Sequence, residues 1–265
     1  MQNLSLHNLG SYKRVWVIGA VKGRVSSLKV LAGKIIEKQK LLDRLVFTGN
    51  ILGPSYEGEN LSAKAVDEAL LLRSRFISNY SSDIDDVVFL RGQFEELLDK
   101  ARQLHISPNP KELVEWMYSR GLDSILSSYG ISSNLLTTAA KNGALALSRA
   151  SVSIQEALVN KNGHYKYISS LKRLAYNEDR SVLVVSAGLA KDRPLEAQSD
   201  ELWWGGGFSN LDEPYGNIIR FIRGFDPEGK GLASGKCGIT LDSGEEGVFA
   251  ALFSSDGRLL ETIQG

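Results

Sequence analysis

The sequence predicts an α/β fold. One observation predicts this class, and a second bounds the number of domains. Short apolar runs rich in β-branched residues end at glycine-containing turns and are followed by helix-like segments, the first unit spanning residues 15–38. A chain of 265 residues, 43% of them apolar, is long enough for one large domain or two small ones. Ligands in open α/β sheets usually lie beyond the carboxyl ends of the strands. We therefore expect a functional site at the turns that follow these runs.

The amino-terminal half predicts three such units. Residues 1–12 are polar and are expected to form a flexible tail ahead of a domain spanning 13–265. The apolar runs 15–18, 45–47 and 87–90 predict buried strands. Helical periodicity follows each of them, at 26–38, 61–76 and 95–104.

A long helix-rich stretch interrupts this alternation. Residues 107–173 carry no strand signal, and the clearer helices are predicted at 112–120 and 135–147. Because strand-like runs resume afterwards, we interpret about 105–175 as a helical insert within one domain.

The carboxyl-terminal part predicts further strands. Apolar runs at 181–185, 218–222 and 239–241 are followed by a hairpin of 248–253 and 259–263 around Asp256-Gly257. The glycines 205–207 lack the Lys-Ser/Thr and the strand-to-helix context of a phosphate loop, so they predict a flexible turn.

Composition narrows the function classes. The formal net charge is zero, which gives no reason to expect a nucleic-acid partner. The single cysteine, Cys237, excludes an intrachain disulfide and is expected to be a small buried residue. No apolar run has the length of a signal peptide or a membrane span, so we expect a cytoplasmic protein.

The turns also carry a family resemblance. Taken in order, they resemble the motifs of calcineurin-like metallophosphatases, in particular the branch of serine/threonine protein phosphatases and bacterial diadenosine-tetraphosphatase-like enzymes. The resemblance implies a four-layer α-β-β-α sandwich with two mixed sheets and a helical insert. It runs from about residue 14 to the end of the chain, and the matching residues are Gly19, Gly23, Arg24, Gly49, Gly53, Pro54, Arg91, Gly92, Glu95, Ser128, Tyr129, Gly130, Ala187 and Gly188.

The residues that carry the family's chemistry are missing. Enzymes of this family are thought to use two divalent metals held by Asp, His, Asp, Asn, His and His, with a further His that protonates the leaving group. The resemblance places Phe94 at the position of that proton donor. Neutral oxygens and a lysine are poor ligands for divalent cations, so we expect no metal, no cofactor and no metal-dependent catalysis. The residues at the six metal-ligand positions are Ala20, Lys22, Asn50, Gln93, Ser186 and Phe225.

Four cations fall near the same turns by this resemblance. Lys22, Arg24, Arg91 and Arg223 could form a metal-free anion site. The favoured interpretation is structural, with Arg24 and Arg91 pairing with carboxylates such as Glu95. Phe94 and Phe225 would also make the floor of the cleft apolar.

Few other side chains could rebuild a catalytic centre. The histidines are His7, His105 and His164, and each is expected to be a surface or capping residue. Asp226 and Asp242 are expected to serve in turn and strand-end hydrogen bonds. Trp203 and Trp204 are expected to be packing or interface residues.

The resulting hypothesis is a pseudophosphatase that acts as a binding, regulatory or structural subunit. Its expected partner is another protein or a second copy of the chain. One alternative is a metal-free sensor that binds a phosphorylated small molecule or nucleotide in the old cleft. A second alternative is an active phosphoesterase with relocated metal ligands.

Overall fold

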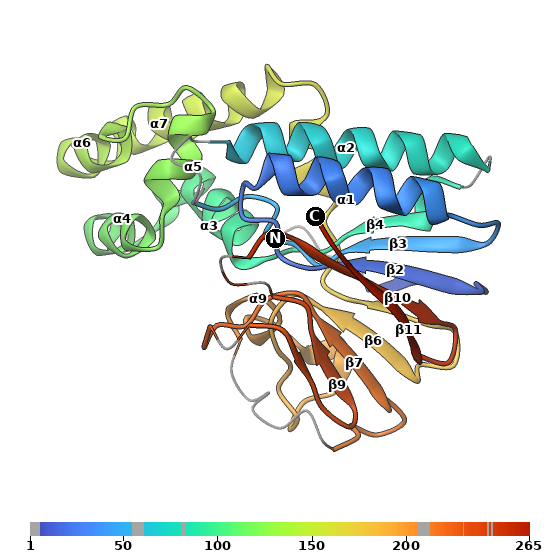
Figure 1. Cartoon of the computed structure of the whole chain (residues 1–265). Helices are drawn as coiled ribbons and strands as arrows, with labels where there is room; N and C mark the ends of the chain where they lie inside the picture. The colour runs from blue at the N-terminus through green and yellow to red at the C-terminus, as the bar shows by residue number, and fades with distance from the viewer. Residues whose placement is uncertain are drawn as a thin grey trace.

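The computed structural model describes residues 6–54, 61–80, 83–205, 213–229, 231–242, 244 and 246–265. Two β-sheets face each other, and the long helices cover the outer face of one of them (Figure 1). The predicted α/β class and the two mixed sheets are confirmed.

The first sheet contains the strand of the unit at residues 15–38. Its central strands run parallel, and the terminal hairpin is added antiparallel to β2, as the sequence predicts. Its five strands, in spatial order, are β11 (Leu259–Gln264), β10 (Phe249–Ser254), β2 (Arg14–Ile18), β3 (Asp43–Phe47) and β4 (Val87–Phe89).

The second sheet is built from the carboxyl-terminal strands and one amino-terminal strand. Strands β6, β7 and β9 are parallel to one another, whereas β5 and β8 are antiparallel to their neighbours β6 and β9. In spatial order the six strands are β1 (His7–Asn8), β5 (Ala175–Tyr176), β6 (Val182–Val185), β7 (Arg220–Arg223), β9 (Gly238–Thr240) and β8 (Ala233–Ser234).

Alternation along β2 explains the layering. Val15 and Val17 pack between the sheets, with Val184 and Ile222 of the second sheet in the same cluster. Trp16 and Ile18 point the other way, into the larger core beneath the helices. Both faces of β2 are therefore buried, which is why its sequence is a continuous apolar run.

The helices fall into three groups. Those over the first sheet are α1 (Val25–Lys38), α2 (Ser62–Asn79) and α3 (Gln93–Arg102). The insert holds α4 (Pro110–Ser119), α5 (Leu122–Ser128), α6 (Leu135–Asn142), α7 (Ala144–Val159) and α8 (His164–Ser170), and it projects to one side (Figure 1). Among the described residues, the second sheet is covered by α9 (Glu201–Trp204) and the 3-10 turn η3 (Leu195–Ala197). Two further 3-10 turns, η1 (Ile84–Asp86) and η2 (Leu104–Ile106), lie elsewhere. No helix in the described ranges is both long and apolar enough to cross a membrane.

Two sequence-based predictions are corrected here. The single helix expected over 135–147 is two helices, because Gly143 adopts φ 89° and ends α6. Within the expected flexible tail, the described residues 6–12 belong to the fold: β1 pairs with β5, and the side chains of Leu9 and Tyr12 are buried. These apolar side chains gain burial by joining the core between the sheets, and the polar residues around them hide that signal.

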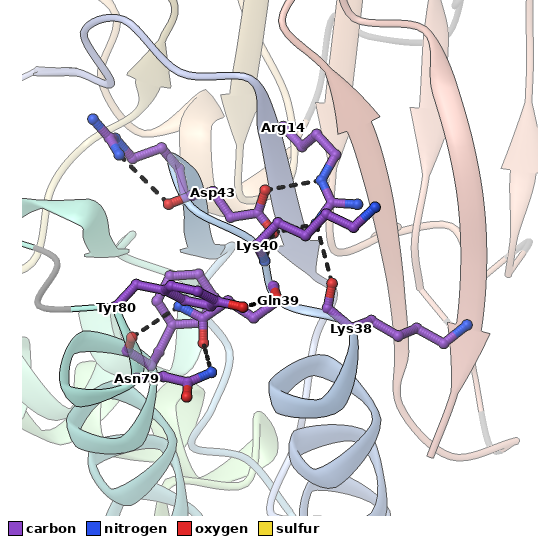
Figure 2. A network of polar contacts seen from close by, with 9 residues as sticks. Arg14, Lys38, Gln39, Lys40, Asp43, Asn79 and Tyr80 are labelled. Carbon is purple, nitrogen blue, oxygen red and sulfur yellow. Dashed lines mark hydrogen bonds and ion pairs between the residues drawn. The ribbon is translucent and has the colours of Figure 1, made fainter.

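Polar contacts fasten the amino ends of β2 and β3, away from the turns (Figure 2). The Arg14 guanidinium donates to the Asp43 carboxylate over 2.8 Å from Nε and to the Lys38 carbonyl over 3.1 Å. Gln39 donates to the Phe76 carbonyl over 2.9 Å, and the Tyr80 hydroxyl donates to the Gln39 carbonyl over 3.1 Å. This network joins the first sheet to the ends of α1 and α2. It lies at the opposite end of the strands from the turns where a site is expected.

Candidate functional site

The turns after the strands of both sheets meet at one point. The Ala20 amide donates to the Gly224 carbonyl over 2.8 Å, and the Gly224 amide donates to the Ser186 carbonyl over 3.1 Å. The Lys22 amide donates to the Asn50 carbonyl over 2.7 Å. Contacts between turns thus bring together predicted positions that are as many as two hundred residues apart in the sequence. All seven, namely Ala20, Lys22, Asn50, Gln93, Phe94, Ser186 and Phe225, are buried.

Close approach of these turns depends on glycine. A Cβ on Gly224 would lie 1.7 Å from the Thr48 hydroxyl, and one on Gly92 would lie 2.3 Å from the Asn50 amide nitrogen. Neither contact is sterically allowed, so only glycine fits at both positions. The retained glycines of the motifs therefore have a packing role that is independent of catalysis.

Lys22 occupies the centre of the site with a carboxylate partner. Its ammonium lies 3.0 and 3.2 Å from the two carboxylate oxygens of Asp242 and 4.8 Å from the centre of the Phe225 ring. Only 7% of Lys22 and 1% of Asp242 are exposed. The ammonium therefore balances the Asp242 charge within a site largely closed to water.

The aspartates at the ends of the second sheet take part in the same network. Asp242 also accepts hydrogen bonds from the amides of Asp226 and Gly244, over 3.0 and 3.2 Å. The Asp226 carboxylate pairs with Arg223 over 3.2 Å. Strand-end hydrogen bonding was predicted for both aspartates; their pairing with cations was not.

The other cations also bind groups of the chain itself. Arg223 donates to the Thr240 hydroxyl over 2.8 Å and to the Ala187 carbonyl over 3.3 Å. Arg24 donates to the carbonyls of Gly247 and Gly244. Arg91 pairs with two carboxylates, Glu96 and Asp99. All four candidate anion-binding cations, Lys22 included, therefore have acceptors within the chain. These internal contacts weaken the attraction of the four cations for an added anion.

Glu95 has a different role from the one expected. The sequence predicts that it pairs with Arg24 or Arg91, but its carboxylate accepts backbone hydrogen bonds from Asn50, Ile51 and Leu52 over 2.8–3.0 Å. It also accepts hydrogen bonds from the Gly92 amide and the Tyr167 hydroxyl. Burial raises the pKa of Glu95, and these hydrogen bonds oppose that rise. The residue orders the loop after β3 from the start of α3.

The donor set does not fit a pair of divalent metals. Ala20 and Phe225 offer no side-chain donor, and Lys22 brings a positive charge. The Asn50 carboxamide is already used: its Nδ2 lies 3.4 Å from the Ser186 hydroxyl, and its Oδ1 accepts from the Phe94 amide over 3.3 Å. Within the described residues, His, Cys, Asp and Glu form no group of three or more suited to hold a metal elsewhere.

His164 is a buried residue, which corrects the prediction of a surface or capping histidine. Its Nδ1 lies 2.9 Å from the Tyr129 hydroxyl, and its Nε2 lies 2.8 Å from the Asp67 carboxylate. Burial lowers the pKa of His164, partly opposed by the hydrogen bond to Asp67. The neutral ring fits this arrangement if the hydroxyl donates to Nδ1 and Nε2–H donates to the carboxylate. The Ser-Tyr-Gly motif at Tyr129 was the one sequence signal for this contact.

The remaining candidates lie outside this centre. His105 is exposed, as expected. Cys237 is buried, also as expected. Trp203 is buried, and Trp204 makes an edge contact with Trp116 at 5.2 Å between ring centres, so both are packing residues. In the predicted turn at 205–207, Gly205 has φ 79° and the other two glycines lie outside the described residues.

Comparison with known proteins addresses the fold. No protein-family profile matches the chain, and no curated protein sequence matches it. Among solved structures, the chain resembles one described as a candidate diadenosine tetraphosphatase, with a TM-score of 0.56 and 17% identity over 99% of this chain and 98% of that chain. A serine/threonine phosphatase from Saccharomyces cerevisiae with similarity to human phosphatase PP5 gives a TM-score of 0.46 and 12% identity over 100% of this chain and 84% of that chain. The first of these likenesses shows that the chain shares the fold of that protein, an α/β fold with two mixed sheets.

Proposed function

We propose that this chain is a pseudophosphatase, a metallophosphatase-like protein without metal-dependent catalysis that serves as a binding, regulatory or structural subunit. The observation that carries the proposal is the buried ion pair of Lys22 and Asp242 beneath Phe225. A fixed ammonium at this point supplies the positive charge that Asp242 needs, and it repels a dication. The glycines that allow the turns to pack are present, but the turns lack the metal-binding side chains that metal catalysis requires.

Hydrolysis of p-nitrophenyl phosphate tests the proposal. The purified chain, given millimolar manganese, is expected to show no turnover above that of the Lys22→Met variant, because neither has a metal-activated water. An active metallophosphatase assayed alongside it serves as the positive control. Metal-dependent turnover that disappears when Asn50 or Asp242 is replaced by Ala would overturn the proposal and favour the alternative of relocated metal ligands.

The metal-free sensor is the second candidate function. The clustering of Lys22 and Arg223 supports it, but both cations bind Asp242 or Asp226, which weakens the attraction for an added anion. We expect phosphate and nucleotides to leave the melting temperature unchanged. A concentration-dependent rise that is lost in Arg223→Gln would favour the sensor instead.

A further inference from the structure

The outer face of α7 carries an apolar stripe. The inner face packs Leu147, Ile154 and Leu158 into the core. On the opposite side, Leu145, Val152 and Val159 are 67%, 53% and 58% exposed. Each is seven residues from the next, so on a helix of 3.6 residues per turn they lie nearly in line, drifting only about 20° per step.

This spacing supplies one of the two positions per heptad that line a helix-pairing seam. The second position holds the polar residues Ser148 and Gln155, so the seam is half apolar. The 16 residues of α7 give a face about 24 Å long. Exposed apolar residues are common when they are scattered, whereas these three lie in line on the solvent side of one helix, about 10 Å apart along its axis.

The charges beside the stripe indicate its partner. Arg149 and Glu156 flank Val152 on the same side of the stripe, and neither has an ion-pair partner among the described residues. In an antiparallel pair of α7 helices centred on Val152, Arg149 of each copy lies opposite Glu156 of the other. A parallel pair would instead set them beside the positions of Ala144 and Ser151, which carry no charge. The pattern is thus self-complementary under a two-fold axis.

We propose that the chain forms a two-fold dimer through antiparallel pairing of α7 with α7 of a second copy. Val152 would meet its own symmetry mate on the axis, and Leu145 would meet Val159. The seam is short, so the dimer is weak and concentration-dependent. The proposal goes beyond the loss of catalysis and stands on α7 alone, so metal titration and measurement of association can fail separately.

Sedimentation velocity of the full chain, from about 1 to 500 µM, tests the dimer because an interface this small belongs to the weak class. The wild-type chain is expected to shift from monomer to dimer across this range. Val152→Glu places two carboxylates on the axis and is expected to raise the dissociation constant at least about tenfold. Val30→Glu on α1 is the matched control, because Val30 is 52% exposed, and the dimer should persist.

A charge swap and a cross-link test the antiparallel geometry of the proposed α7 pair. Arg149→Glu and Glu156→Arg are each expected to weaken the dimer, and the double variant should restore it. Val152→Cys should form a disulfide-linked dimer under mild oxidation, because the native Cys237 is buried. The proposal is overturned by a monomer at every concentration, by a dimer that tolerates Val152→Glu, or by singly and doubly swapped variants that associate equally.

Discussion

At the scale of single residues, Lys22 and Asp242 form an ion pair in which both side chains are buried. Removing one partner leaves the other charge buried without compensation, which costs about 3–5 kcal/mol. We expect Lys22→Met to lower the free energy of unfolding in urea by this amount. The Lys22→Met/Asp242→Asn double variant should lose less than the two single variants add up to, because it buries no unpaired charge.

The control for this pair is Lys29→Met, a substitution of the same type at an exposed position on α1. It should change the free energy of unfolding by no more than about 0.5 kcal/mol. If Lys22→Met were as stable as the wild-type chain, the ammonium would not be balancing Asp242, and the electrostatic account of the site would fail.

His164 provides a pH-dependent test at the same scale. Its pKa is lowered in the folded chain, so below the ordinary value of 6.5 the unfolded chain binds a proton that the folded chain does not. Stability should therefore fall as the pH drops below 6.5, with a slope of at most about 1.4 kcal/mol per pH unit for one proton. His164→Gln removes this titration.

Urea unfolding of both proteins between pH 5 and pH 8 measures the effect. The difference between the two curves is needed, because the pKa of His7 is also lowered by burial. Parallel curves for wild-type and His164→Gln would show that the histidine does not titrate differently on folding.

At the scale of the elements, two glycines with open space around them predict opposite effects of alanine. Gly143 has φ 89° between α6 and α7, whereas Gly33 lies within α1, and neither would bring a Cβ within 4 Å of another atom. Gly143→Ala is expected to destabilise the chain by about 1–3 kcal/mol through backbone strain. Gly33→Ala is expected to stabilise it by about 0.5–1 kcal/mol. Thermal unfolding measures both, and the same sign for both variants would refute the backbone explanation.

The elements also show what a sequence can predict. The strands before Gly19, Gly49 and Gly92 were predicted to within a few residues, because local apolar runs and glycines determine them. The break at Gly143 was missed because its neighbours continue the helical pattern. Gly143 has a positive φ at this break, and α6 and α7 pack against each other on either side of it.

The candidate site was predictable in position but not in its pairing. Family resemblance brought Ala20, Asn50 and Ser186 together in advance, and the structure places their turns in contact. The partner of Lys22 lies 220 positions away, and no local pattern identifies a contact at that distance. The same applies to Glu95, whose backbone partners come from the loop after β3, and to His164 with Asp67.

At the scale of the whole molecule, the buried ion pair of Lys22 and Asp242 lies where the two sheets meet. The two sheets meet through the turns that carry this ion pair, since Lys22 follows β2 of the first sheet and Asp242 follows β9 of the second. The pair therefore joins the two sheets, and under the proposed function this link is a reason for the fold to persist.

Calorimetric titration of the wild-type chain with manganese tests this account most directly. The positive control is the same chain with the family's ligands restored by Ala20→Asp, Lys22→His, Asn50→Asp, Gln93→Asn, Ser186→His and Phe225→His, checked for folding by circular dichroism. We expect no binding heat from the wild-type chain at millimolar manganese, and binding by the restored variant. Stoichiometric, tight binding to the wild-type chain that is lost in Asn50→Ala would contradict the account, whatever the restored variant does.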